Sequence, residues 1–386
     1  MRKILSKIDI PLLIVAVMLI SFGLVMIYSS SSITAVVRYG FQPYHFFVRQ
    51  AAAIMLAVGV GTFCITFPTK HYKKVMPFLL FGLILALVYL LSRSESDSIN
   101  NAQSWIKLGF FSLQPSEFAK TFLIIYFASY YNDLSNKSNY RIGKLFQPLV
   151  YALFIIALVV VQPDLGSAVI ISAICFMMFI SVPEVRKNKS IVIKVLGVAL
   201  AVAVILTMFF GNKIINKMQS SRFNFTNPCS RYTESTGYQV CNGFIAINNG
   251  GLFGVGLGNS TQKYLYLPES HTDFIFPIII EETGLIAGIL VIALYAYLLS
   301  RILKIAKKSE NLRCSLLAYG TFWYLTFHIL VNLMGVLALI PLTGVPLPFL
   351  SYGGSFILNA VVMLFIVERA NFENNINKTN REIKSL

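Results

Sequence analysis

The chain alternates between apolar runs of membrane-spanning length and shorter polar connections. A helix needs about 20 mostly apolar residues to cross the hydrocarbon core of a bilayer. About ten runs of that kind recur, at residues 10–28, 46–67, 75–91, 111–131, 146–162, 165–183, 191–210, 274–299, 315–340 and 355–367. The pattern predicts an all-α polytopic membrane protein, with one transmembrane domain over residues 1–370 and a tail over residues 371–386.

The distribution of basic residues predicts the orientation of these runs. Placing both termini in the cytoplasm puts 22 of the 32 Lys and Arg residues on the inner side and 8 on the outer side. This asymmetry follows the positive-inside rule, and it requires an even number of spans. We interpret the net charge of +16 as an orientation signal. Nucleic acid is not predicted as a partner, because no basic stripe with interleaved aromatic residues lies in a soluble domain.

One large extracellular loop, residues 211–273, separates the seventh and eighth predicted spans. It carries five basic residues against Glu234 and Glu269, an excess that suits an anionic ligand at the outer face; they are Lys213, Lys217, Arg222, Arg231 and Lys263. Six glycines, at 243, 250, 251, 254, 256 and 258, either let backbone approach a ligand or only permit tight turns.

Two of the five cysteines, Cys229 and Cys241, lie in this loop. An outward location permits a disulfide, and we predict one there, two unpaired thiols being the alternative. No CxxC, HExxH or GxxxxGK[ST] pattern occurs, and GVGLGN lacks the spacing of the dinucleotide fingerprint. The sequence therefore predicts no certain cofactor, although a divalent cation stays compatible with it.

Several charged or aromatic residues at the predicted spans have both a structural and a functional interpretation. Arg49 lies near the outer end of the second run, where it either snorkels to the interface or binds a ligand. Trp105 and Lys107 lie in the outer loop 92–112, where such a pair is usually an anchor in the headgroup belt.

Charged residues lie in the fourth predicted span and directly before the sixth. Glu117 and Lys120 are three residues apart, so a helix places them on one face as an ion pair. Such a pair is more often structural, but intramembrane charges also tend to face a cavity, which keeps a substrate role open. Asp164 precedes a helix start, where it caps the helix or lines the outer cavity.

The polar loop meets the eighth span at His271, Thr272 and Asp273. A carboxylate at the boundary between water and hydrocarbon is costly unless it is used or paired. On a regular helix, Glu281 and Glu282 lie about 80° and 180° around the axis from Asp273. We therefore assign Asp273 to chemistry and the two glutamates to bundle packing.

The segment PLTGVPLPFLSYGGS at 341–355 combines three prolines with four hydroxyl residues, including Ser351. Irregular backbone at membrane depth is tolerated only where protein buries it or where it lines a cavity. We expect this segment to form an outer turn at the site.

A single carboxylate beside a basic loop suits one class of reaction. A glycosidase needs two opposed carboxylates, whereas a sugar linked through diphosphate has a good leaving group once cations or a metal neutralise it. One base then suffices to activate an attacking hydroxyl. The residues alone thus indicate an outer-face site for an anionic lipid-linked substrate.

Four blocks occur in fixed order: QSWIKLGFFSLQPSEFAK at 103–120, QPDLGS at 162–167, GVGLGNSTQKYLYLPESHTDFIF at 254–276, and PLTGVPLPFLSYGGS at 341–355. They resemble the SEDS family of bacterial cell-wall polymerases, which includes FtsW, RodA and SpoVE. Within it, the stretch GLFGVGLGNSTQKYLYLPE is more similar to FtsW, a division enzyme. The family commonly has RWI where this chain has Ser104-Trp105-Ile106, which weakens a phosphate-binding role at position 104.

The resemblance implies a multi-pass protein of the bacterial plasma membrane that polymerises lipid II at the outer face. It implies that Asp273 is the general base and that the partners are lipid II, membrane lipids, a class B penicillin-binding protein transpeptidase and divisome proteins. Candidate substrate-binding residues are Arg49, Trp105, Lys107, Glu117, Lys120, Asp164, Lys263, His271, Thr272 and Ser351. A lipid II flippase and a non-catalytic division scaffold remain the alternatives.

Overall fold

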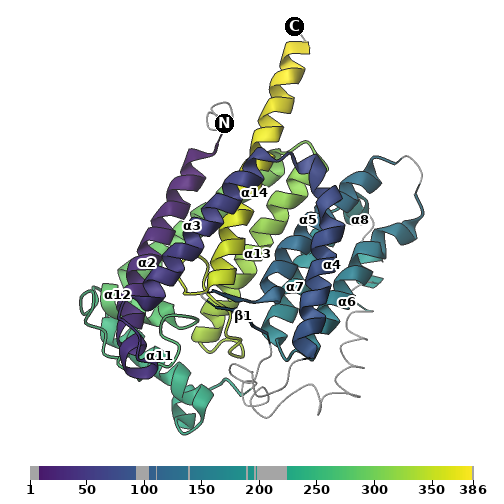
Figure 1. Cartoon of the computed structure of the whole chain (residues 1–386). Helices are drawn as coiled ribbons and strands as arrows, with labels where there is room; N and C mark the ends of the chain where they lie inside the picture. The colour runs from purple at the N-terminus through teal and green to yellow at the C-terminus, as the bar shows by residue number, and fades with distance from the viewer. Residues whose placement is uncertain are drawn as a thin grey trace.

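The computed structural model describes residues 8–92, 104–109, 111–137, 140–187, 190–194, 197 and 224–384. The described chain is almost entirely helical (Figure 1). Its helices are α2 (Ile10–Tyr39), α3 (His45–Thr66), η1 (Thr69–His71), α4 (Tyr72–Leu91), α5 (Pro115–Ser135), η3 (Ile142–Phe146), α6 (Gln147–Val161), α7 (Leu165–Ile180), α8 (Pro183–Lys187), η4 (Pro228–Arg231), α11 (Ser235–Gly250), α12 (Ile275–Lys308), α13 (Leu312–Val336) and α14 (Gly354–Lys384). Strands β1 (Ile106–Leu108) and β2 (Phe111–Leu113) form an antiparallel hairpin in which Lys107 faces Ser112.

Nine of the ten predicted spans correspond to helices among the described residues, and most of the tenth, 191–210, lies outside them. Within the described part of the chain, seven helices are long and apolar enough to cross a membrane. The other two are α5, which contains Glu117 and Lys120, and the shorter α7. The architecture is that of a polytopic membrane protein, as predicted.

Two boundaries differ from the sequence prediction. Helix α2 continues eleven residues past position 28 to Tyr39, and Gly40 caps it in the left-handed conformation. The hydroxyls of Ser30 and Ser32 in this extension hydrogen-bond carbonyls of the preceding turn. The predicted fourth span begins too early, since residues 111–113 form strand β2. Pro115 then occupies the first turn of α5, where its missing N–H costs no hydrogen bond.

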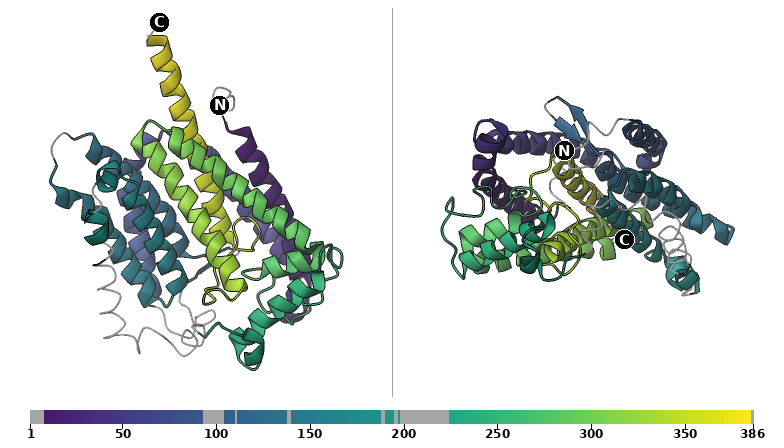
Figure 2. Two further views of the ribbon diagram at one scale, coloured as in Figure 1. Left: turned by 180° about the vertical axis from the view of Figure 1, so that it is seen from behind. Right: turned by 90° about the horizontal axis from the view of Figure 1, so that it is seen from below.

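The helices form two groups joined by α13 and α14. Helices α2, α3, α11 and α12 lie on one side and α4 to α8 on the other, with the hairpin between them (Figure 1). The views from behind and from below show the same division (Figure 2). Helix α14 packs along α3, α13 contacts α5, α7 and α12, and α4 packs on α5. Gly61 permits the close approach of α3 to α14, because a Cβ there would clash with Phe365.

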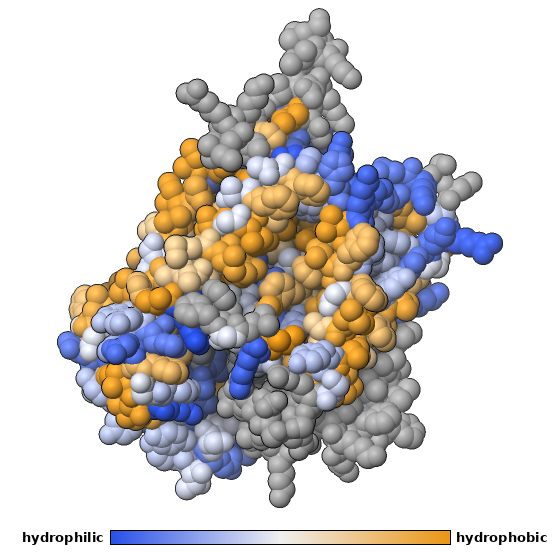
Figure 3. All heavy atoms as spheres, viewed as in Figure 1, coloured by the Kyte–Doolittle hydropathy of each residue, from blue (hydrophilic) through white to orange (hydrophobic). Residues whose placement is uncertain are grey.

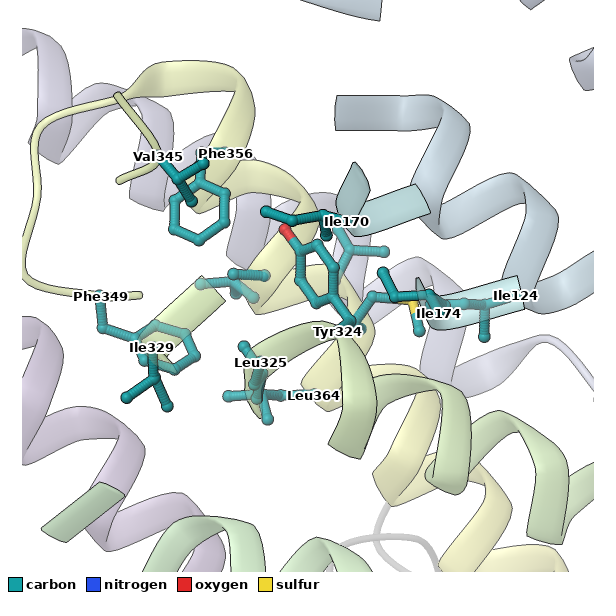
Figure 4. Close-up of a cluster of buried hydrophobic side chains, with 14 of the residues drawn as sticks. Ile124, Ile170, Ile174, Tyr324, Leu325, Ile329, Val345, Phe349, Phe356 and Leu364 are labelled. Carbon is teal, nitrogen blue, oxygen red and sulfur yellow. The ribbon is translucent and has the colours of Figure 1, made fainter. Parts of the chain in front are cut away.

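The core beneath the site lies where α5, α7, α13 and α14 meet. Figure 4 shows Tyr324 of α13 surrounded by apolar side chains of the other three helices: Ile124, Ile170, Ile174, Phe356 and Leu364. Val345 and Phe349 of the connection before α14 enter the same cluster. The core therefore fixes that connection, residues 337–353, against the bundle.

The two ends of the bundle differ. Helix α2 begins and α14 ends at one end, and α11 with the hairpin lies at the other (Figures 1 and 2). Apolar residues cover the middle of the face in Figure 3, and polar residues gather towards the lower left and upper right. Large apolar side chains of the helices are exposed, among them Phe78 of α4 by 78%, as expected of a surface that faces lipid. Both ends of the chain thus lie on one side, as an even number of spans requires.

Candidate functional site

Asp273 lies at the end of the bundle opposite the two chain ends, just before α12. Its side chain is 7% exposed, and its Oδ1 lies 3.2 Å from the Thr272 hydroxyl. The amide of Asn332, on α13, donates to the carbonyl of Asp273 and to that of Val345, both at 2.8 Å. One buried amide therefore joins the candidate base to the 337–353 segment. Asn332 was not foreseen from the sequence, where it reads as an ordinary residue of an apolar helix.

The 337–353 segment crosses the site as irregular backbone, as predicted. Gly344 lies beside Asp273, so that a Cβ there would be 3.7 Å from Oδ2. Gln50 of α3, fully buried, donates to the Ser351 carbonyl (3.2 Å) and accepts from the Gly353 N–H (3.1 Å). The Ser351 hydroxyl accepts from Leu347 N–H (2.8 Å). Protein groups thus satisfy this backbone, and Gln50 is a second residue that the sequence did not reveal.

His271 is buried between aromatic rings. Its ring centroid is 4.6 Å from that of Phe46 and 5.7 Å from that of Tyr352, and its carbonyl accepts from Tyr352 N–H at 2.8 Å. Burial, with a smaller contribution from Arg38, lowers the pKa of His271 to about 4. The imidazole is therefore neutral at physiological pH. The guanidinium of Arg49 lies next to the Tyr352 phenol and opposes the rise in pKa that burial gives that group, so Arg49 belongs to this cluster.

Thr272 links Asp273 to a second carboxylate. Its hydroxyl lies 2.6 Å from Glu269 Oε2 and 3.2 Å from Asp273 Oδ1, and one hydroxyl hydrogen can serve only one of them at a time. The sequence argument named Glu269 as a charge of the loop but did not place it beside Asp273. Both carboxylates lie near one hydroxyl of the same segment, whereas a glycosidase holds its two carboxylates on opposite sides of the scissile bond.

The predicted pair of Glu117 and Lys120 is present. Lys120 Nζ lies 2.6 Å from Glu117 Oε1, and both side chains are buried. The same ammonium lies 3.1 Å from Nε2 of His328 on α13, whose ring stacks on Phe356 at 4.6 Å. The pair is therefore part of a buried polar cluster between α5 and α13, and His328 is the member that spacing could not identify.

Asp164 caps α7, as predicted, with Oδ1 accepting from Ser167 N–H at 3.1 Å. Its other oxygen accepts from Gln114 Nε2 (3.0 Å) and Ser116 Oγ (2.9 Å) at the start of α5. Both carboxylate oxygens thus serve helix starts. A role for Asp164 in the cavity stays a prediction.

Trp105 and Lys107 lie on the hairpin, Trp105 half-buried and Lys107 exposed. Ser355 at the start of α14 holds the hairpin, donating to Ser112 O (3.0 Å) and accepting from Gln114 N–H (3.0 Å). The structure thus fixes the hairpin against the start of α14, and the binding role of Trp105 and Lys107 stays a prediction.

Glu281 and Glu282 are buried inside the protein, in line with their assignment to bundle packing, but the angle argument behind that assignment does not hold. Asp273 precedes α12, so the angles counted along one regular helix do not apply. Glu281 accepts hydrogen bonds from the loop, including Thr261 Oγ1 (2.9 Å), and Glu282 pairs with Lys263 (2.9 Å). Buried carboxylates need such partners. The ammonium of Lys263 is already neutralised inside the protein, and its predicted contact with substrate is untested.

The basic outer loop is only partly described. Lys213, Lys217 and Arg222 lie outside the described residues, and Arg231 pairs with Glu234 at 2.9 Å. The predicted disulfide is present and joins Cys229 of η4 to Cys241 of α11, with 4.9 Å between the Cα atoms. Among the described residues no three His, Cys, Asp or Glu side chains converge, so a divalent cation stays a prediction without an assigned site.

Comparison with known proteins gives the family. The FtsW/RodA/SpoVE family model, described as a cell cycle protein, matches residues 10–376. A protein of Bacillus subtilis named probable peptidoglycan glycosyltransferase FtsW is 38% identical over 357 residues, covering 92% of this chain and 88% of the relative. Stage V sporulation protein E of the same organism is 34% identical, covering 94% and 97%.

Solved structures show the same fold. A chain of a peptidoglycan synthase complex that coordinates polymerization and crosslinking has a TM-score of 0.73, and it covers 95% of this chain and 98% of its own length. RodA of Thermus thermophilus has a TM-score of 0.66, with coverage of 95% and 97%; both are 22% identical. Because the family model spans nearly the whole chain and relatives exceed 30% identity over most of their length, this protein belongs to the FtsW/RodA/SpoVE family of cell cycle proteins.

Proposed function

We propose that this protein is a peptidoglycan glycosyltransferase of the division machinery, which polymerises lipid II into glycan strands at the outer face of the cytoplasmic membrane. The curated relatives that carry this activity in their names cover almost the whole chain. The observation that carries the proposal is the setting of Asp273. It is a carboxylate nearly enclosed by protein, at the end of the bundle opposite the termini.

The proposed reaction needs one base and one good leaving group. Asp273 takes the proton of the 4-hydroxyl of an acceptor GlcNAc, and that oxygen attacks C1 of the donor MurNAc. The bond from C1 to the diphosphate oxygen breaks, the configuration at C1 inverts, and undecaprenyl diphosphate leaves with the electron pair. A base whose backbone is fixed, here by Asn332 at 2.8 Å, keeps its geometry between encounters with substrate.

Other residues support this assignment. Neutral His271, two residues before Asp273, packs near Tyr352, which lies beside Arg49. The Glu117–Lys120–His328 cluster lies between α5 and α13. We assign the substrate-binding role to groups of these two clusters, which include an arginine suited to phosphate oxygens. The partner we propose is a class B penicillin-binding protein within the divisome, since a solved relative is part of a polymerising and crosslinking complex.

The deciding experiment is reconstitution of the purified protein in liposomes with lipid II. Wild type is expected to make glycan, and Asp273→Asn is expected to bind lipid II normally while its rate falls about 10²- to 10⁴-fold, the usual contribution of a positioned base. Asn keeps the shape of the side chain but cannot accept the proton.

The alternatives give different results. A flippase moves lipid II between leaflets and makes no glycan even as wild type. A scaffold supports growth as Asp273→Asn. Full polymerase rate in folded Asp273→Asn contradicts the assignment of the base, and Glu269→Gln is then the next variant to measure.

A further inference from the structure

Helix α12 is interrupted at Gly284, whose backbone angles (φ 85°, ψ 167°) are not helical. The loop of residues 250–256 fills the interruption. Four backbone hydrogen bonds join the two: Val255 N to Glu281 O (2.9 Å), Gly256 N to Glu282 O (3.0 Å), Leu285 N to Gly251 O (2.9 Å) and Ile286 N to Leu252 O (3.3 Å). A break in a membrane helix must have its freed groups satisfied by protein, and this loop does so.

A buried ion pair between Lys263 and Glu282 also holds this loop against α12. Lys263 Nζ donates to Glu282 Oε1 (2.9 Å), to the Gly258 carbonyl (2.6 Å) and to the hydroxyl of Ser29 on α2 (3.2 Å). These three partners use all three ammonium hydrogens. Ser29 donates in turn to Glu282 (2.6 Å). The side chains of Lys263 and Glu282 are 4% and 0% exposed.

The chain from Lys263 to Asp273 is held at two points by adjacent residues of α2. Lys263 contacts Ser29 at one point, and Ser270 donates to the Ser30 carbonyl (3.1 Å) at the other. Asp273 follows Ser270 after two residues. On its other side, Asp273 leads into the half of α12 before the break, which contains Glu282. The ion pair therefore holds the chain on both sides of Asp273. Lys263 fixes the segment before it, and Glu282 fixes the first half of α12 after it.

We propose that Lys263 and Glu282 are positioning residues that hold Asp273 at the reacting atoms by locking the loop and the broken α12 onto α2. This inference rests on the proposed function. It gives Lys263 a role different from contact with the substrate diphosphate, because an ammonium in contact with a diphosphate has to leave a buried carboxylate, which carries a large desolvation cost.

The test separates positioning from substrate contact. Lys263→Met leaves Glu282 buried without its cation and lets the segment before Asp273 shift. A misplacement of about 1 Å at a reacting group costs about 10²-fold in rate. We therefore expect kcat for glycan synthesis from lipid II to fall about 10²-fold, with KM and the Kd for lipid II unchanged. The double variant Lys263→Met/Glu282→Gln is expected to regain at least tenfold of this loss, because neither charge is then left uncompensated.

The matched control is Lys73→Met, which breaks the exposed pair with Asp133 at 2.9 Å and is expected to keep wild-type kcat. Thermal unfolding of each purified variant reports its folding, and the double variant provides the comparison where Lys263→Met fails to fold. A raised Kd for lipid II in Lys263→Met with no recovery in the double variant overturns the positioning role and assigns Lys263 to the substrate. Unchanged kcat in Lys263→Met also overturns it. Absence of glycan from wild type overturns the proposed function, which is a separate result.

Discussion

The side chains around Asp273 come from positions far apart in the chain. Asn332 is 59 residues away from Asp273 in sequence, and Gln50 is about 300 residues from the backbone that it holds. Each supplies a side-chain amide to carbonyls of irregular segments. The sequence identified the acidic residues of the site. It did not identify the side-chain amides of Asn332 and Gln50, which hold the backbone around the site.

His271 gives a prediction about pH. Its pKa is about 4 in the folded protein and about 6.5 in an unfolded chain. Between these values the unfolded chain binds a proton that the folded protein does not, so His271 lowers stability as pH falls. His271→Phe retains an aromatic ring beside Phe46 and removes the titration. From pH 7.5 to pH 5, wild type is expected to lose about 2 kcal/mol more free energy of unfolding than the variant.

The measurement is unfolding of both proteins in the same detergent at the two pH values. Equal losses in wild type and His271→Phe contradict the assignment of a neutral buried imidazole.

At the scale of elements, regular helices obey the spacing rules and broken ones do not. Glu117 and Lys120 are three apart on unbroken α5 and pair as predicted. Asp273 precedes α12 and the helix is broken at Gly284, so counting 100° per residue from Asp273 could not show that Glu281 and Glu282 bond to the loop before Asp273. The loop 250–256 stabilises the break, and that contact is not visible in the α12 sequence.

The Glu117–Lys120 pair gives a prediction about stability. Removing one member leaves a buried charge, which typically costs about 3–5 kcal/mol. Glu117→Ala and Lys120→Ala are each expected to lower the amount of protein in membranes and its unfolding temperature. The swap Glu117→Lys/Lys120→Glu is expected to restore part of both.

The exposed pair Lys73–Asp133 is the control, because the same swap at the surface changes stability by less than about 1 kcal/mol. Silent single variants, or a swap whose loss equals the sum of the single losses, contradict a coupled pair.

At the scale of the whole molecule, the packing places the two chain ends together. The start of α2 and the end of α14 share one side of the bundle, and α11 lies on the other (Figures 1 and 2). The excess of basic residues in the connections on the side of the termini predicts that this side is cytoplasmic.

Reporter fusions test this orientation in cells. A fluorescent protein fused after Leu386 is expected to fluoresce, and alkaline phosphatase inserted after the exposed Tyr232 is expected to be active. The reverse pattern, or two reporters active on the same side, contradicts an even number of spans with cytoplasmic termini.

The sequence by itself determined those features whose physics is local. Transfer of about 20 apolar residues into a bilayer favours a helix wherever the run occurs, so the predicted spans match the described helices apart from a few boundaries. A capping side chain bonds only to the first turn of the helix that follows it, and Asp164 caps α7 in this way, as predicted. The boundary between the polar loop and the apolar run likewise lies in contiguous residues, and it placed Asp273 just before α12, as observed.

Only the tertiary structure decided which buried polar groups became partners. Lys263 meets Ser29 across 234 positions, and Lys120 meets His328 across 208. A buried charge takes whatever partner packing brings within reach, and that packing depends on how α2, α12 and α13 cross. The sequence therefore identified the carboxylates and ammonium groups of the site. Contacts between helices that are far apart in the sequence decide which of these groups are available for chemistry and which hold the structure.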